Sequence, residues 1–277
     1  MLRFATLLLA AVVATVAPAD TLDQAQQSGT ITLAVANEIP YGYLSAEGEP
    51  RGEAPAIALQ TLKALGIDRV EVLVTEFGAL IPGLKAGRFD VIAAGMYITP
   101  KRCRQILFSN PTYRIGEGFL VPSGNPHALH GYADIKDKPA LKLGVMAGAV
   151  EFGYARDFGI PLDRVVTLPD YPSGVAALKT GRIDALAGTV LTMAELGRKE
   201  RAVELAQPFT KLVIDGKPVD GYGGFGFRPG DERLRDAFNA QLAGFIGSAD
   251  HLALVEPYGF GRHTLPGAVS AAQLCQP

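Results

Sequence analysis

The chain has 277 residues, of which 48% are hydrophobic and 19% are charged, a composition typical of globular rather than disordered proteins. Its 26 basic and 28 acidic residues give a formal net charge of −2. No basic cluster stands out, so we expect no nucleic-acid partner. A chain of this length can form one large core or two smaller lobes.

The N-terminal residues 1–19 have the pattern of a signal peptide. Arg3 supplies a positive charge, residues 4–16 are apolar, and residues 17–19 read Ala-Pro-Ala, a small-residue cleavage site. The apolar run is shorter than the roughly 20 residues that span a bilayer, although an uncleaved anchor is the alternative. No later stretch is apolar enough to span, and we predict a periplasmic protein.

The chain contains two cysteines, Cys103 and Cys275. Two thiols in an oxidising compartment usually pair, and the alternative is two unpaired buried thiols. A disulfide would join the C-terminal tail to the first third of the chain. Closing so long a loop contributes about 4–5 kcal/mol to stability in the chain-entropy model.

Short strands and helices alternate along most of the chain. In the first part, residues 31–36, 70–74 and 89–94 are typical of strands, and residues 54–65 and 80–86 have helical spacing before a glycine. The same order returns later, with strands at 141–145, 165–168 and 183–187 and helices at 149–158 and 175–180. A turn between two strands at 215–218 is followed by helices at 232–245 and 249–255. This alternation predicts parallel sheets covered by helices.

An internal repeat supports two similar lobes. Residues 76–95 (EFGALIPGLKAGRFDVIAAG) align without gaps with residues 170–189 (DYPSGVAALKTGRIDALAGT). The alignment places acid on acid, aromatic on aromatic and Asp90 on Asp184. The alternative is that helix–glycine–strand turns resemble one another in any α/β protein, but the shared acid–aromatic start favours a true repeat.

We therefore predict an α/β protein with two parallel-sheet lobes joined by two linker strands. Residues 20–122 and 227–277 are expected to form lobe one, and residues 123–226 lobe two. The closing helices then return to lobe one, and ligands are expected in the cleft, at the carboxyl ends of the strands.

Catalytic and cofactor motifs are few. The chain has no H-E-x-x-H, G-x-S-x-G or P-loop sequence. Residues 221–226 match G-x-G-x-x-G but lack the strand-to-helix context that a nucleotide site needs, so a glycine-rich entry to a linker strand is preferred. His127 and His130 have no other metal-ligand types nearby. We predict no metal and no cofactor.

Three predicted strand ends carry residues that suit a small zwitterion. Glu38 and Tyr41 follow the first strand, Phe77 the second, and Tyr97 and Arg102 the third. Aromatic faces attract a cation, Arg binds a carboxylate through two parallel hydrogen bonds, and Glu38 would neutralise the cation. The alternative is that the aromatics belong to the core and that Arg102 caps a surface helix.

Several strings in the chain resemble a known family. The segment ITPKRCRQILFSNPTY (98–113) and the closing EPYGFG (256–261) are similar to periplasmic solute-binding proteins of ABC importers, in the polar amino-acid group, which have the type II periplasmic-binding-protein fold. VANEIPYGYL and TEFGALIPGLKAGRFDVIAAGMYITPKRC resemble the ectoine/hydroxyectoine-binding subfamily, and Cys103 and Cys275 also match its pattern.

The resemblance implies a role for each of the residues at the strand ends. Glu38 pairs with the ring nitrogens of the ligand, and Arg102 holds its carboxylate with help from the backbone near Gly95. Three aromatic residues box the cyclic amidinium: Tyr41, Phe77 and Tyr97.

This chain departs from the family pattern in lobe two. Thr189 stands where amino-acid binders have an acid for the α-amino group, which suits a ligand without a free α-amino group. Val150 stands where a Thr often donates to the carboxylate, and a backbone N–H would have to substitute. Glu151, Asp170 and Tyr171 are further lobe-two candidates without an assigned role.

The resemblance thus implies a monomeric periplasmic receptor, not an enzyme. It would capture ectoine or hydroxyectoine and deliver it to the permease and ATPase subunits of an ABC importer. Three alternatives stay open: a binder of another zwitterion (a polar amino acid, a betaine or proline), an exported enzyme that uses Glu38 as general acid or base, and an additional signalling role of the closed form.

Overall fold

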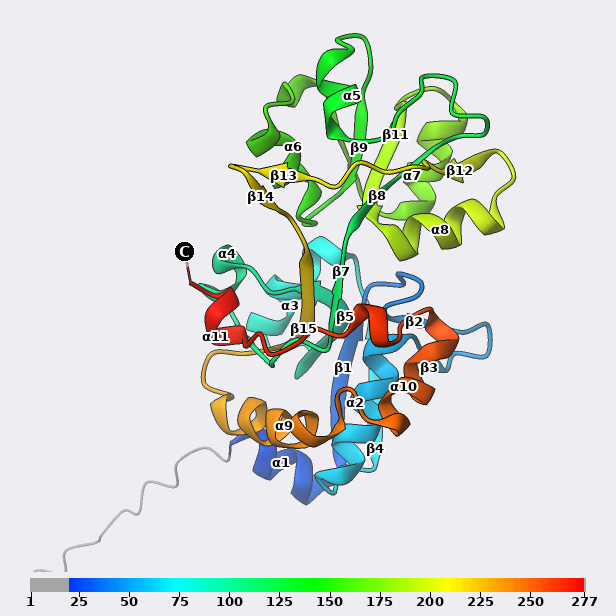
Figure 1. Cartoon of the computed structure of the whole chain (residues 1–277). Coiled ribbons are helices and arrows are strands. Elements are labelled where there is room, and N and C mark those ends of the chain that lie inside the picture. Colours follow the sequence, from blue (N-terminus) through cyan, green and yellow to red (C-terminus); the bar gives the residue numbers. More distant parts are fainter. Residues whose placement is uncertain (1–19, 277) are drawn as a thin grey trace, which may run out of the picture.

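A computed structural model describes residues 20–276, so the predicted signal peptide lies outside the described residues. The chain forms two sheet-containing lobes, as predicted (Figure 1). The first sheet has the strand order β4 (Arg69–Val74), β1 (Thr30–Val35), β5 (Val91–Tyr97), β15 (Gly221–Phe227) and β6 (Leu107–Phe108), and β7 (Tyr113–Ile115) also pairs with β15. The second sheet has the order β10 (Val165–Leu168), β9 (Leu143–Met146), β11 (Ala185–Thr189), β8 (Glu117–Pro122) and β12 (Val203–Leu205).

Each sheet contains the predicted parallel strands, joined by antiparallel ones. β4, β1 and β5 are parallel, as are β10, β9 and β11, whereas β15, β6, β8 and β12 pair antiparallel with their neighbours. β8 follows β7 after the single residue Gly116, so it enters the second lobe at the cleft and runs away from it. The parallel strands of that lobe run toward the cleft, which makes β8 antiparallel to them.

Strand pairing also corrects the expected lobe boundaries at 122 and 226. β8 was assigned to lobe one but belongs to the second sheet. β15 was assigned to lobe two, except for its last residue, but belongs to the first sheet. Both segments carry the chain between the lobes (Figure 1). Their sequences are apolar and contain glycine, so they do not indicate which of the two sheets each strand joins.

Helices from both ends of the chain cover the first sheet. α9 (Glu232–Phe245) buries Leu234, Phe238 and Leu242, which lie at helical spacing on one face. These side chains share one core with buried residues of α1 (Thr21–Ser28), α2 (Glu53–Ala64), α10 (Ala249–Val255) and β1. The prediction that the closing helices return to the first lobe is confirmed.

The second sheet has its own helices, α5 (Tyr132–Asp137), α6 (Glu151–Phe158), α7 (Tyr171–Lys179) and α8 (Val190–Lys199). Two hairpins project from the lobes, β2 (Tyr43–Leu44) with β3 (Pro50–Arg51) and β13 (Val213–Ile214) with β14 (Lys217–Pro218), and the second confirms the predicted turn. The remaining elements are α3 (Leu80–Lys85), α4 (Pro100–Cys103), α11 (Ala271–Leu274) and the short 3-10 helices η1 (Phe77–Ala79), η2 (Leu162–Arg164), η3 (Glu256–Tyr258) and η4 (Arg262–Thr264).

The internal repeat is structural. The side chain of Asp90 accepts a hydrogen bond from the Thr32 N–H at 3.0 Å, and the Asp90 N–H donates to the Thr32 carbonyl at 2.8 Å. Asp184 makes the same two bonds with Lys142, at 2.8 and 2.9 Å. In each lobe the aligned aspartate therefore ties the start of one strand to the backbone of its parallel neighbour, within β1 at Thr32 and just before β9 at Lys142.

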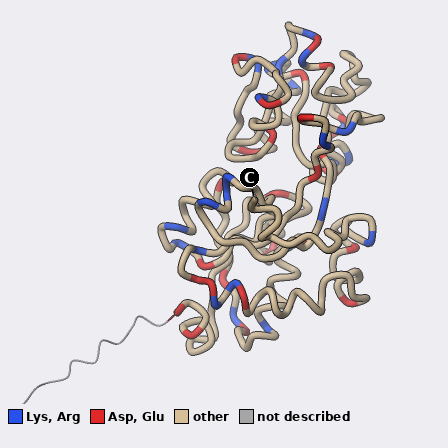
Figure 2. Tube along the Cα trace, turned by 60° about the vertical axis from the view of Figure 1, so that its left-hand side comes forward, with Lys and Arg blue, Asp and Glu red and all other residues tan. Residues whose placement is uncertain are grey.

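The predicted disulfide forms between Cys103 and Cys275, with the Cα atoms 5.6 Å apart. It fastens α11 to α4 at the edge of the first lobe (Figure 1). Figure 2 shows that acidic and basic residues are intermixed over both lobes, in keeping with the small net charge. Among residues 20–276, no helix is long and apolar enough to cross a membrane.

Candidate functional site

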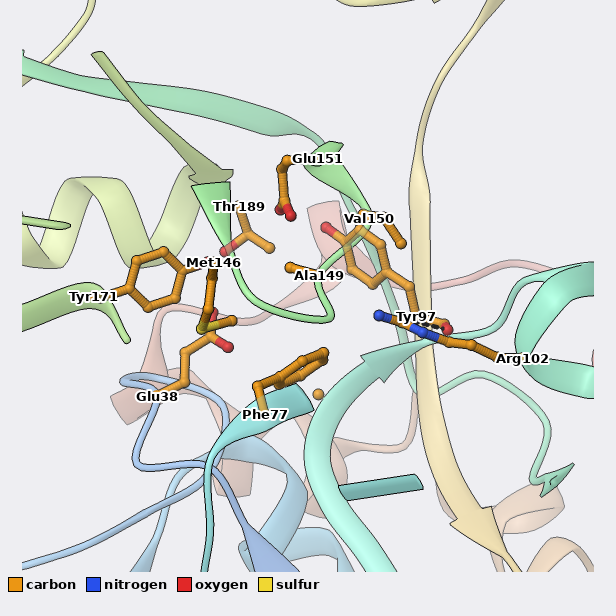
Figure 3. A pocket seen from close by; sticks show the side chains of 11 residues that line it. Glu38, Phe77, Tyr97, Arg102, Met146, Ala149, Val150, Glu151, Tyr171 and Thr189 are labelled. Carbon is orange, nitrogen blue, oxygen red and sulfur yellow. Dashed lines mark hydrogen bonds between the residues drawn. The ribbon is translucent and has the colours of Figure 1, made fainter. Parts of the chain in front are cut away.

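A pocket of about 280 Å³, part of it open to solvent, lies between the two lobes (Figure 3). Its first-lobe wall contains Glu38, Phe77, Gly95, Tyr97 and Arg102, all of which follow or end the parallel strands. Val150 and Thr189 line it from the second lobe. The structure thus brings together seven of the eight predicted binding residues.

Glu38 is held by a tight loop after β1. Backbone hydrogen bonds join Glu38 to Gly42 in both directions, at 3.0 and 2.9 Å. The loop continues to α2, whose first N–H groups donate to the carbonyls of Pro40 and Tyr41. These bonds satisfy helix N–H groups that would otherwise lack partners, and they fix Glu38 at the cleft.

A chain of hydroxyl groups connects Glu38 to the second lobe. Thr189, at the N-terminus of α8, donates to the Thr192 hydroxyl at 3.1 Å, and Thr192 donates to Glu38 Oε1 at 2.8 Å. Glu38 is only 6% exposed, and burial raises its pKa to about 8 despite the Thr192 hydrogen bond. The Glu38 carboxyl in this closed cleft thus retains its proton at neutral pH until a cation approaches.

Arg102 also bridges the lobes. Its Nη1 donates to the Tyr97 carbonyl at 2.8 Å in its own lobe, and its Nη2 donates to the Gly148 carbonyl at 2.9 Å in the other. The guanidinium carbon lies 5.4 Å from the centre of the Phe77 ring. Because both of these acceptors are neutral carbonyls, the positive charge of Arg102 remains available to a carboxylate in the pocket.

Three aromatic side chains line the pocket, but one differs from the prediction. Phe77 and Tyr97 do so as expected, and the third is Tyr171, the first residue of α7. The internal repeat pairs Phe77 with Tyr171 and Gly95 with Thr189, so both aligned pairs lie in the pocket.

The expectation that Tyr41 contacts the ligand is not supported by its position. Tyr41 is 1% exposed and packs against Tyr113 and Phe260, with ring centres 5.3 and 5.4 Å away. Gly95 has a positive φ of 63°, and a side chain there would overlap the Tyr41 ring. Tyr41 therefore packs behind Gly95 and supports the pocket from beneath, with its hydroxyl group near Thr189.

The start of α6 forms the opposite wall. Ala149 and Val150 lie on the pocket just before this helix, and Glu151 is its first residue. The first N–H groups of a helix lack intrahelical partners, so this end favours a negatively charged group. The backbone here therefore fits the role expected where Val150 replaces a threonine.

Two buried carboxyl groups, Glu151 and Glu117, lie at the second-lobe side of the site. Glu151 is 2% exposed and lines the pocket, whereas Glu117 is 7% exposed at the start of β8. Burial raises the pKa of both, and the negative charge of Glu151 raises that of Glu117 further. The neighbouring Arg102 lowers the pKa of Glu151, so Glu151 is the more easily ionised of the two.

Sequence reasoning gave no role to several residues that shape the site. Met146 and Ala149 line it as apolar residues at a strand end, a pattern shared with ordinary core positions. Thr192 contacts Glu38 from one helical turn after Thr189, and no motif indicates this bond. Glu151 and Tyr171 were candidates without a role, whereas Asp170 caps α7 by accepting from the Ser173 N–H at 2.8 Å.

The weaker motifs have structural explanations. Residues 221–226 lie in β15, and a side chain at Gly221 would overlap the Tyr97 ring, so this glycine makes room for the pocket wall. His127 lies 3.4 Å from Asp184, and His130 bonds the Pro208 carbonyl. Within residues 20–276 no group of His, Cys, Asp and Glu side chains is arranged to hold a metal ion.

The chain belongs to the bacterial extracellular solute-binding proteins, family 3, whose model matches residues 31–261. It is therefore a solute-binding protein of the ABC-importer class and not an enzyme, and it has the type II periplasmic-binding fold.

Individual relatives add detail about what similar proteins bind. A probable amino-acid ABC transporter periplasmic-binding protein of Sinorhizobium fredii is 39% identical over 93% of this chain and 85% of its own length. The crystal structure of EhuB in complex with hydroxyectoine is 36% identical, with a TM-score of 0.83, over 93% of this chain and 99% of EhuB. A histidine-binding periplasmic protein of Salmonella typhimurium is 26% identical over 79% of this chain and 83% of its length.

Proposed function

We propose that this protein is a monomeric periplasmic receptor that captures ectoine or hydroxyectoine and delivers it to the permease and ATPase subunits of an ABC importer. The observation that carries the proposal is the placement of Glu38 and Arg102 at two sides of one pocket with aromatic faces between them. A compact zwitterion with a carboxylate and a delocalised cation complements this arrangement.

Each group of such a ligand has a partner. Arg102 receives the carboxylate, together with the backbone at the start of α6. Phe77, Tyr97 and Tyr171 contact the cationic ring, and Glu38 pairs with its N–H groups. Thr189 provides no carboxylate for an α-ammonium group, which favours a ligand without one.

The alternative is another zwitterion, above all a polar amino acid, as the names of the S. fredii and S. typhimurium relatives suggest. One feature of the site favours it. Glu151 provides a second-lobe carboxyl near Arg102, although Thr189 does not.

Titration calorimetry on refolded, ligand-free protein distinguishes these candidates. The solutes are ectoine, hydroxyectoine, glycine betaine, proline, glutamine and histidine. We expect tight binding of one or both ectoines only. Binding of an amino acid or betaine with no response to the ectoines would reject the proposed ligand while keeping the role of solute receptor.

A further inference from the structure

Glu151 is a buried carboxyl group of the pocket that a simple zwitterion leaves without a partner, and the hydroxyl group of Tyr97 is unpaired beside it. The Oε2 atom of Glu151 is buried and has no hydrogen-bond partner among the described residues. Figure 3 shows the carboxyl directed into the pocket from the wall opposite Phe77, between the sides occupied by Glu38 and Arg102. A carboxylate and one cation account for Arg102 and Glu38, so a third polar group of the ligand is needed for Glu151.

Glu117 keeps Glu151 available as an acceptor. The Glu117 carboxyl is buried next to that of Glu151 and is its hydrogen-bond neighbour, with no other partner among the described residues. Two adjacent carboxylates cannot both ionise cheaply, so one proton remains on the pair. Arg102 favours ionisation of Glu151, which places this proton on Glu117 and leaves Glu151 as the acceptor that faces the ligand.

The position of Glu151 indicates which part of the ligand it meets. Arg102 bonds the carbonyl of Gly148, three residues before Glu151 on the same segment. A ligand carboxylate on Arg102 therefore brings its neighbouring carbon atoms toward Glu151. Glu38 lies at another side of the pocket, where it meets the cationic end.

We propose that Glu151, supported by Glu117, is a specificity-determining residue that accepts a hydrogen bond from a donor group carried next to the ligand carboxylate. On the basis of the proposed function, this donor is the hydroxyl group of a hydroxylated cyclic zwitterion. The protein then prefers hydroxyectoine to ectoine, because ectoine leaves the buried Glu151 unpaired.

The test is calorimetry with hydroxyectoine and ectoine on the ligand-free chain from residue 20 onward. A hydrogen bond to a charged acceptor gives an expected wild-type preference of roughly 10- to 100-fold for hydroxyectoine. Glu151→Ala removes the acceptor and is expected to bring the two affinities within about threefold, mainly through weaker hydroxyectoine binding. Glu151→Gln retains an amide oxygen and is expected to give an intermediate ratio. Glu71→Ala, which removes an exposed carboxylate from β4, is the matched control and keeps the wild-type ratio.

The outcomes separate this inference from the proposed function. If both ectoines bind with similar affinity, or if Glu151→Ala leaves their ratio unchanged, the role of Glu151 is overturned and the function stands. If only glutamine or histidine binds and Glu151→Ala abolishes it, the ectoine function fails but the acceptor role is upheld, with an α-ammonium as the donor. If none of these solutes binds, both are overturned.

Discussion

Replacing Glu38 by Gln is expected to shift the ligand-free protein toward its closed form at neutral pH. Glu38 belongs to the first lobe and is bonded to Thr192 of the second, so it is buried when the lobes meet. Burial raises its pKa to about 8 in this closed cleft. In an opened cleft water would hydrate the carboxyl and return its pKa toward the ordinary value of 4.5.

The size of the effect follows from the two pKa values. One unit of pKa difference corresponds to about 1.4 kcal/mol, so at pH 7, about 2.5 units above the open-cleft pKa, closing the empty cleft over Glu38 costs about 3.4 kcal/mol, or a factor of roughly 300 in population. The closed form binds the extra proton between pH 4.5 and about 8. Closure without ligand therefore weakens as pH rises through this window and levels off above it. A ligand cation next to Glu38 removes this cost.

Small-angle scattering of the ligand-free protein measures the effect through its radius of gyration. Wild type is expected to be more compact at pH 5.5 than at pH 8, and Glu38→Gln to show a smaller difference between the two pH values, with the remainder due to Glu151 and Glu117. Glu151, Arg102 and Tyr171 also face Glu38, so the comparison with the variant isolates its contribution. Glu53→Gln is the control, because Glu53 is equally buried but bonds Thr112 within the first lobe. The reasoning fails if Glu38→Gln has the wild-type radius at every pH.

Four further predictions concern binding and stability. Arg102→Ala should weaken ectoine binding by about 3–5 kcal/mol in calorimetry, since the ligand carboxylate loses its buried partner; retention of wild-type affinity would remove Arg102 from the site. Phe77→Ala should cost about 1–3 kcal/mol of binding, and an unchanged affinity would show that the ring does not contact the ligand. Tyr41→Phe should change affinity less than about threefold, because the buried Tyr41 hydroxyl accepts and donates no hydrogen bond of good geometry among the described residues; a large loss would place Tyr41 in contact with the ligand after all. Joint replacement of Cys103 and Cys275 by Ser should lower the free energy of unfolding by about 5 kcal/mol in urea, given a sequence separation of 172 residues, and an unchanged midpoint would contradict the chain-entropy estimate.

The sequence predicted the site best where sheet geometry determines it. Carboxyl ends of parallel strands meet at one edge, so residues that follow separate strands, such as Phe77 and Tyr97, could be expected to converge. Tyr41 could not be placed this way, because the turn between Glu38 and Gly42 decides its direction. Glu151 remained without a role because an acidic residue at the first position of a helix is common for its effect on the helix dipole alone.

The lobe boundaries were missed for a related reason. The crossing strands β8 and β15 are apolar throughout, and hydrophobicity alone does not show which sheet a buried strand joins. The internal repeat predicted the pocket better than hydrophobicity predicted the lobe boundaries. It aligns Phe77 with Tyr171 and Gly95 with Thr189, and all four residues line the pocket. An aligned position in a duplicated lobe occupies the same edge of its own sheet, and both edges face one cleft.

The side chains proposed to recognise the ligand also join the two lobes. Arg102 bonds Gly148 and Glu38 bonds Thr192, so each charged first-lobe residue of the pocket already has a partner in the second lobe. The two contacts differ in the charge state that each side chain has when the empty cleft closes. Arg102 keeps its charge and bonds a neutral carbonyl, whereas Glu38 closes most easily with its proton retained. A solute that carries only a carboxylate would pair with Arg102 but would leave the free-energy cost of burying an ionised Glu38. Under the proposed function, the ligand therefore needs both a negative and a positive charge for the cleft to close over it.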